Sequence, residues 1–126
     1  MLNVNKWLAK ALDAGGVTLD CSEEPMRKNV GDKPYITWEH GKAVNRYAGG
    51  APFETHYPVR MYLWLPPTAE SWQDTLTAME KAVVLYGGDD TVACYIQSST
   101  GATDAPAINR KAVQLELIIV ERLWNA

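Results

Sequence analysis

Apolar residues recur at helical spacing in two stretches of the chain. In residues 2–14 they fall on one side of a 3.6-residue period, polar residues lie opposite, and Gly15-Gly16 follows as a stop signal. The second stretch runs from Thr68, which is placed to cap a helix, to Gly87-Gly88, which is placed to end it. Its apolar stripe consists of Trp72, Leu76, Met79, Val83 and Tyr86. The pattern therefore predicts two helices, each with one apolar face.

Elsewhere apolar and polar positions alternate, which is typical of strands with one buried face. The alternation predicts strands at residues 17–21, 34–40, 55–65, 92–97 and 109–123. In 55–65, the strongest of them, Val59 and every second residue point one way, and Arg60, Tyr62 and Trp64 point the other.

Three segments without a period separate these elements. Residues 22–33 and 98–106 are polar, and each predicts a loop. Residues 41–54 contain two adjacent glycines and a proline, so we expect a loop or an irregular hairpin tip that forms a mobile arm. No repeat or linker divides the chain, so we expect residues 1–126 to form a single domain. The element order predicts an α+β fold with a mainly antiparallel sheet and two helices packed on one face.

Composition narrows the function classes. A chain of 126 residues with 47% hydrophobic residues is typical of one globular domain, and its net charge of −3 disfavours nucleic-acid binding through bulk charge. We therefore expect no sequence-specific contact with nucleic acid. The sequence has no run of eighteen apolar residues, so we expect no membrane partner. It shows no leader pattern, so we expect the protein to be in the cytoplasm after its synthesis. Cys21 and Cys94 lie in apolar alternations, which favours two reduced core thiols over a disulfide.

Candidate chemistry is sparse. His40 and His56, with Glu39 and Glu54 nearby, would hold a metal if their strands pair, but solvated histidines at strand ends are commoner. Carboxylates suited to magnesium occur at Asp20, Glu39, Asp89 and Asp90. The last two directly follow Gly87-Gly88, where aspartate commonly stabilises a turn. We assign no catalytic residue, metal or cofactor, and keep a small metal-dependent enzyme that cleaves phosphodiesters as the alternative of a different class.

Aromatic residues are the more informative feature. Arg60, Tyr62 and Trp64 share one face of the strongest strand, and Ile118 and Val120 occupy the matching face of the last strand. If both helices pack on the other face of the sheet, these side chains form an amphipathic surface that requires a partner, unless a loop or residues 41–54 cover it. The sequence is consistent with both interpretations. The same segment carries Arg46, Tyr47 and Phe53, which provide a second candidate contact if the arm orders on a partner.

Five segments of the chain, taken in order, carry a resemblance to a known family. They are an amphipathic helix, a strand that opens on Lys-Pro-Tyr-Ile-Thr-Trp, the strongest strand, a long helix and a long closing strand, at residues 2–14, 33–38, 59–65, 70–86 and 110–121. The chain resembles, over nearly its whole length, the small tail terminator (tail completion) proteins of long-tailed bacteriophages, which include the minor tail protein U type.

The resemblance implies a structural protein that acts by shape, without catalysis. It implies a hexameric ring that sits on the last ring of a tail tube, ends its polymerisation and offers a surface to the head-side connector. The protein would be assembled in the host cytoplasm and reside in the tail of the virion. Another head–tail joining or neck protein is the alternative within the same setting.

Overall fold

The structure, a computed structural model, describes residues 2–123, and Met1 and residues 124–126 lie outside the described part of the chain. That part contains two α-helices, one short 3-10 helix (η1) and seven strands. In chain order the elements are α1 (Val4–Ala14), β1 (Asp20–Glu23), β2 (Tyr35–His40), β3 (Val44–Ala48), β4 (Ala51–Leu65), α2 (Gln73–Val84), β5 (Val92–Ser99), β6 (Thr103–Ala105), η1 (Pro106–Ile108) and β7 (Arg110–Arg122). The predicted α+β class is confirmed. Among the described helices, none is both long and apolar enough to span a membrane.

All the described strands belong to one sheet, whose long central pair is β4 and β7. The main strand order is β1-β2-β4-β7-β5, while β3 pairs with the first part of β4 and β6 with the first part of β7. Within residues 2–123 only the β1–β2 pair is parallel, and the other pairs are antiparallel. The sheet is therefore mainly antiparallel, as the sequence predicts.

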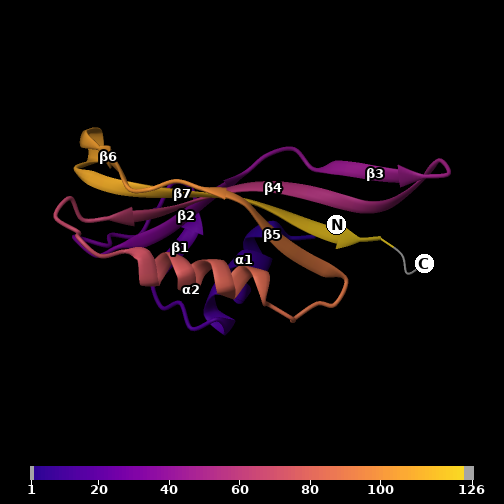
Figure 1. The fold of residues 1–126 in the computed structure, drawn as a ribbon, viewed down its shortest axis with the longest axis horizontal. Coiled ribbons are helices and arrows are strands. Elements are labelled where there is room, and N and C mark those ends of the chain that lie inside the picture. Colours follow the sequence, from indigo (N-terminus) through magenta and orange to yellow (C-terminus); the bar gives the residue numbers. More distant parts are fainter. Residues whose placement is uncertain (1, 124–126) are drawn as a thin grey trace.

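Both helices lie on one face of this sheet (Figure 1). α1 buries Trp7 and Leu8, and α2 buries Met79 and Val83. They meet the alternating side chains of β4 and β7, which are Tyr57, Val59, Met61, Leu63, Leu65, Val113, Leu115, Leu117 and Ile119. A slip of one residue in β4 would turn its whole set of core side chains to the other face, so this burial fixes the register of the sheet.

The first predicted strand is displaced. It begins at Asp20 and not at residue 17, because the backbone N–H of Val17 donates to the carbonyl of Leu12 at 3.0 Å and so belongs to the end of α1. Val17 and Leu19 instead pack against the margin of the core. Cys21, expected in the core, is only half-buried, whereas Cys94 is buried, and both thiols are free.

The start of the second helix also differs from the expectation, because Thr68 does not cap it. The carbonyl of Pro66 accepts a hydrogen bond from the N–H of Ala69 at 3.1 Å, so the chain leaves β4 through a tight turn. α2 starts only at Gln73, with Trp72 at the N-cap position and no side-chain cap hydrogen bond. Trp72 packs against the core, and this packing places the first turn of the helix.

Of the two alternatives expected for residues 41–54, the structure shows the hairpin, formed by β3 and the first part of β4. Gly49 and Gly50 join β3 to β4 with φ values of +59° and +81°, as a two-residue type I′ turn requires. Because β3 is hydrogen-bonded to β4, the hairpin continues the sheet in its own plane and projects beyond the helices as an arm (Figure 1). The interpretation that this segment covers the face of Arg60, Tyr62 and Trp64 is therefore wrong.

Residues 98–106 are likewise more ordered than a loop. β5 continues to Ser99, and β6 and the start of η1 follow within the segment expected to be irregular. The N–H of Thr100 donates to the carbonyl of Gln114 at 2.9 Å, which ties the start of the connection to β7.

Candidate interaction surface

The face of the sheet turned away from the helices is the candidate site, and we call it the open face. Within residues 2–123 no helix or strand is layered over it (Figure 1). The register of the strands divides its side chains into three zones. These are an aromatic end (Tyr35, Thr37, Tyr62, Trp64), a charged band (Glu39, Arg60, Glu116) and an aliphatic end (Pro58, Ile118, Val120, with Val44, Ala93 and Tyr95 at its margins).

The aromatic end is a rigid stack. Trp64 lies between Tyr62 and Tyr35, with ring centroids 5.5 Å and 6.2 Å away and interplanar angles of 30° and 26°. Its indole N–H donates to the hydroxyl of Thr37 at 2.8 Å, and the guanidinium of Arg110 lies 4.7 Å from the centroid of the Tyr35 ring. The arrangement suits a flat contact with another protein surface.

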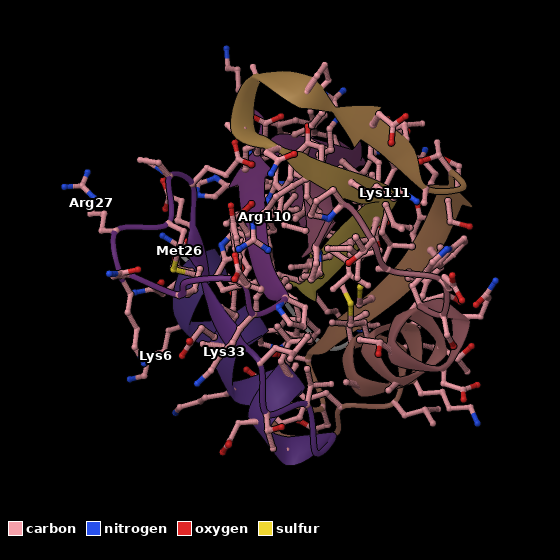
Figure 2. The ribbon with its side chains drawn as sticks, turned by 90° about the vertical axis from the view of Figure 1, so that its left-hand side faces the viewer. Lys6, Met26, Arg27, Lys33, Arg110 and Lys111 are labelled. Carbon is pink, nitrogen blue, oxygen red and sulfur yellow. The ribbon has the colours of Figure 1, made fainter. Side chains whose placement is uncertain are left out.

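Arg110 also fixes the loop beside this end. Its guanidinium donates to the carbonyl of Lys33 at 2.9 Å and to the carbonyl of Gly31. Figure 2 shows Arg110 within the outline of the molecule, whereas the side chains of Arg27 and Lys6 reach outward. Arg110 therefore has a structural role, because it contacts two backbone carbonyls and the ring of Tyr35.

Arg60 occupies the middle of the charged band. Its guanidinium lies 3.4 Å from a carboxylate oxygen of Glu39 and 3.6 Å from one of Glu116. The hydroxyl of Tyr62 donates to Glu39 at 3.0 Å, and partial burial followed by this hydrogen bond raises the pKa of Tyr62 above its ordinary value. A depression of about 410 Å³ opens beside Arg60, between Glu39, Pro58, Gln97 and Glu116. The band pairs its charges internally, so it is polar without a strong field of one sign.

The aliphatic end is more accessible. Ile118 and Val120 are half-buried, and at its margins Val44 is 52% exposed and Tyr95 is 45% exposed. Pro58 lies opposite Ile118 on the neighbouring strand. Pro58, Ile118, Val120, Ala93 and Tyr95 therefore form an apolar strip that reaches the β5 margin of the sheet, while His56 separates it from Val44 at the β3 margin.

The arm supplies the remaining predicted residues. Arg46 lies opposite Glu54 and Tyr47 opposite Pro52, so both point to the side of the open face, which a bulge between them permits. Tyr47 is 61% exposed. Phe53 precedes Glu54 in the alternation and points to the opposite side, so it does not join the other candidates on the open face.

The structure separates the histidines proposed as metal ligands. His56 lies 2.7 Å from Glu54, whereas His40 lies 3.7 Å from Glu23 and not near Glu54. Glu39 contacts Arg60 instead of a histidine.

Three of the four carboxylates proposed for magnesium are engaged elsewhere, Glu39 with Arg60 among them. Asp20 pairs with Lys28 at 2.9 Å, and Asp89 accepts hydrogen bonds from Thr91, which lower its pKa. Among residues 2–123, no group of three histidine, cysteine, aspartate or glutamate side chains lies together in a way that could hold a metal.

Sequence reasoning identified the residues of β4 and β7 on the open face but not Tyr35, Thr37 and Arg110. Tyr35 and Thr37 alternate in the predicted strand 34–40, yet their face follows only from the register with Trp64 and Tyr62. Arg110 carries no local signal, because its partners lie 77 and 79 residues away in the chain.

Comparisons with known proteins inform the fold alone. No family model matches the chain, and no curated protein matches its sequence significantly. Chains of known structure do match the fold. One of them, whose name states no function, has a TM-score of 0.56 at 15% sequence identity, covering 96% of this chain and 97% of the other. At this identity the likeness extends to the architecture and not to activity or partners.

Proposed function

We propose that this protein is an assembly protein of a long-tailed bacteriophage, a tail terminator that forms a ring on the end of the tail tube and stops its polymerisation. The open face carries the proposal. Its apolar side chains are held in place by stacking and by strand pairing, and no described helix or strand covers them. A surface of this kind is stabilised when another protein surface covers it.

A ring needs two different patches on each subunit, since one patch must match the other on the neighbouring copy. The chain offers such patches in the apolar strip of the open face and in the arm that carries Tyr47. The order of elements that resembles tail terminators supports a ring of six copies. One side of the ring would meet the tail tube, and the other would meet the head-side connector.

The proposal is tested by the mass of the protein in solution, measured by size-exclusion chromatography with light scattering. We expect a single species with a fixed copy number, and six is the number that the resemblance implies. Adding it to a polymerising tail tube protein is expected to stop growth of the tube. A head–tail joining protein of another kind would form the ring without stopping tube growth.

Substitutions of exposed apolar residues sharpen the test. Tyr47→Ser combined with Tyr95→Ser removes two exposed aromatic rings from the side of the open face, and we expect it to yield monomers. Leu85→Ser is the matched control, because Leu85 is 75% exposed at the end of α2, in the other layer. A native chain that stays monomeric at all concentrations and does not bind tube protein would contradict the proposal.

A further inference from the structure

We propose that neighbouring copies of this chain join by antiparallel strand addition, with β3 of one copy beside β5 of the next, so that the sheet continues across the joint. The inference rests on the proposed ring and names the backbone edges that form it. Strand addition satisfies backbone N–H and carbonyl groups that an edge strand otherwise leaves to water.

Among the described strands, four have an edge without a strand partner: β1, β3, β5 and β6. β1 has only four residues, of which Asp20 and Glu23 are acidic, and charges of this kind disfavour pairing with another strand. β6 has only three residues. The edges of β3 and β5 therefore remain as the two that suit a joint.

The edge of β5 lacks the usual protection of an exposed strand. Natural edge strands carry charges or prolines that block pairing with other chains, but β5 reads Val-Ala-Cys-Tyr-Ile-Gln-Ser-Ser, without a charged residue or a proline. The bulge in its pairing with β7 comes only after Ile96, so Val92–Ile96 is regular. An uncharged edge of this length is suited to a partner strand.

The strand directions favour an antiparallel joint. β3 is antiparallel to β4, β4 to β7, and β7 to β5, so β3 and β5 run in opposite directions at opposite margins of the sheet. If the ring axis is parallel to the strands, the rotation that relates one copy to the next leaves every strand direction unchanged. It therefore brings β3 of one copy antiparallel to β5 of the next, which is the commoner and more stable pairing.

The two edges also lie at the same level. One row of directly paired residues crosses the sheet from Val44 through His56 and Val120 to Ala93. The side chains of all four residues point to the open face. A ring relates its copies by rotation without a shift along the axis, so Val44 of one copy comes to lie beside Ala93 of the next. The joint would then place Val44 of one copy beside the apolar strip of the next.

The experiment is a disulfide trap between copies. In the variant Val44→Cys with Ala93→Cys, the paired Cα atoms would lie about 4.5–5.5 Å apart, within disulfide range. Mild oxidation of the assembled protein is expected to give a ladder of covalent oligomers on a denaturing gel. Each single variant keeps the native thiols and provides the control, and we expect it to give no ladder.

A second pair of variants tests the edges without new thiols. Val44→Lys and Ala93→Lys each place a charge at the joint, and we expect both to shift the ring to monomers by at least tenfold in the concentration needed for assembly. Ala78→Lys adds the same charge at an exposed position of α2 and is expected to leave assembly unchanged.

The outcomes separate this inference from the proposed function. A ring of fixed copy number without cross-links in the double-cysteine variant, or rings that tolerate both lysines, would overturn the strand joint and leave the ring in place. A native chain that never assembles would overturn both.

Discussion

The hydroxyl of Thr37 is a buried polar group on a sheet face that is otherwise open. It is 2% exposed, donates to a carboxylate oxygen of Glu24 at 2.8 Å and accepts from the indole N–H of Trp64 at 2.8 Å. One side chain thus joins the loop after β1 to the aromatic stack. Its geometry fixes the ring of Trp64 before any partner arrives, and such preorganisation lowers the entropy cost of binding.

Thr37→Val tests this role at nearly constant shape. The valine leaves the indole N–H of Trp64 and a carboxylate oxygen of Glu24 without this partner, so we expect the free energy of unfolding to fall by about 1–3 kcal/mol. Thr37→Ser keeps the hydroxyl and is expected to cost less than the valine variant. Urea denaturation of the three proteins measures the difference, and equal losses in the two variants would contradict the role of the hydroxyl.

The thiol of Cys94 is expected to make the free energy of unfolding fall as the pH rises into the alkaline range. Burial raises the pKa of its thiol from 9.0 to about 12. The unfolded chain therefore loses this proton at lower pH than the folded chain, so the stabilisation is complete below about pH 9 and declines as the pH rises toward about 12. We expect a decline of up to about 1.4 kcal/mol per pH unit from this group.

Denaturation of the native chain and of Cys94→Ala, measured from pH 8 to pH 11, isolates that contribution. The variant loses packing at every pH, but its stability is expected to fall less steeply above about pH 9. The pKa of Tyr57 is also raised, chiefly by burial, and this contribution persists in both proteins. Parallel curves would show that the thiol of Cys94 does not titrate as expected.

At the scale of elements, the two helices pack so closely at Gly15 that no side chain fits between them. Gly15 has φ −81°, an ordinary value, but a Cβ added there would lie 2.4 Å from the Cβ of Ala82 on α2. Gly16 beside it has φ +79° and takes the left-handed conformation that ends a helix. The sequence indicates Gly15-Gly16 as one stop signal, but the two glycines have separate roles: Gly15 allows the helices to pack closely, and Gly16 ends α1.

Gly15→Ala is expected to destabilise the fold by about 1–3 kcal/mol, because α1 and α2 must move apart to make room for the methyl group. Gly87→Ala is the matched control, since a Cβ at Gly87 meets no atom within 4 Å. Adding Ala82→Gly to Gly15→Ala is expected to recover part of the loss, and a double-mutant cycle measures that coupling. Additive effects of the two substitutions would contradict the close contact.

Periodic elements were predictable from the sequence, and irregular ones were not. The core faces of β4 and β7 follow from strict alternation, and this alternation also placed Arg60, Tyr62 and Trp64 together. The short strand β3 was missed because Gly49-Gly50 and Pro52 resemble a loop, whereas they form a tight turn and the start of a paired strand. Thr68 matched a local capping pattern, but the packing of Trp72 decided where α2 begins.

At the scale of the whole molecule, the fold separates stability from assembly. The core lies between the helices and one face of the sheet, while the proposed contacts lie on the other face and on the arm. Substitutions of exposed residues away from buried contacts usually change stability by less than about 0.5 kcal/mol. We therefore expect substitutions at the proposed contacts to abolish assembly while the subunit remains folded.

This separation makes thermal unfolding a test of the assembled state. A ring that binds only folded subunits stabilises them by mass action, so the apparent Tm of the native chain is expected to rise with protein concentration. For a chain of this length we expect about 3–6 °C for each tenfold increase. Tyr47→Ser with Tyr95→Ser is expected to unfold at one temperature at all concentrations, equal to that of the dilute native chain. A Tm that depends on concentration in this variant would show that the ring is held by contacts other than the open face and the arm.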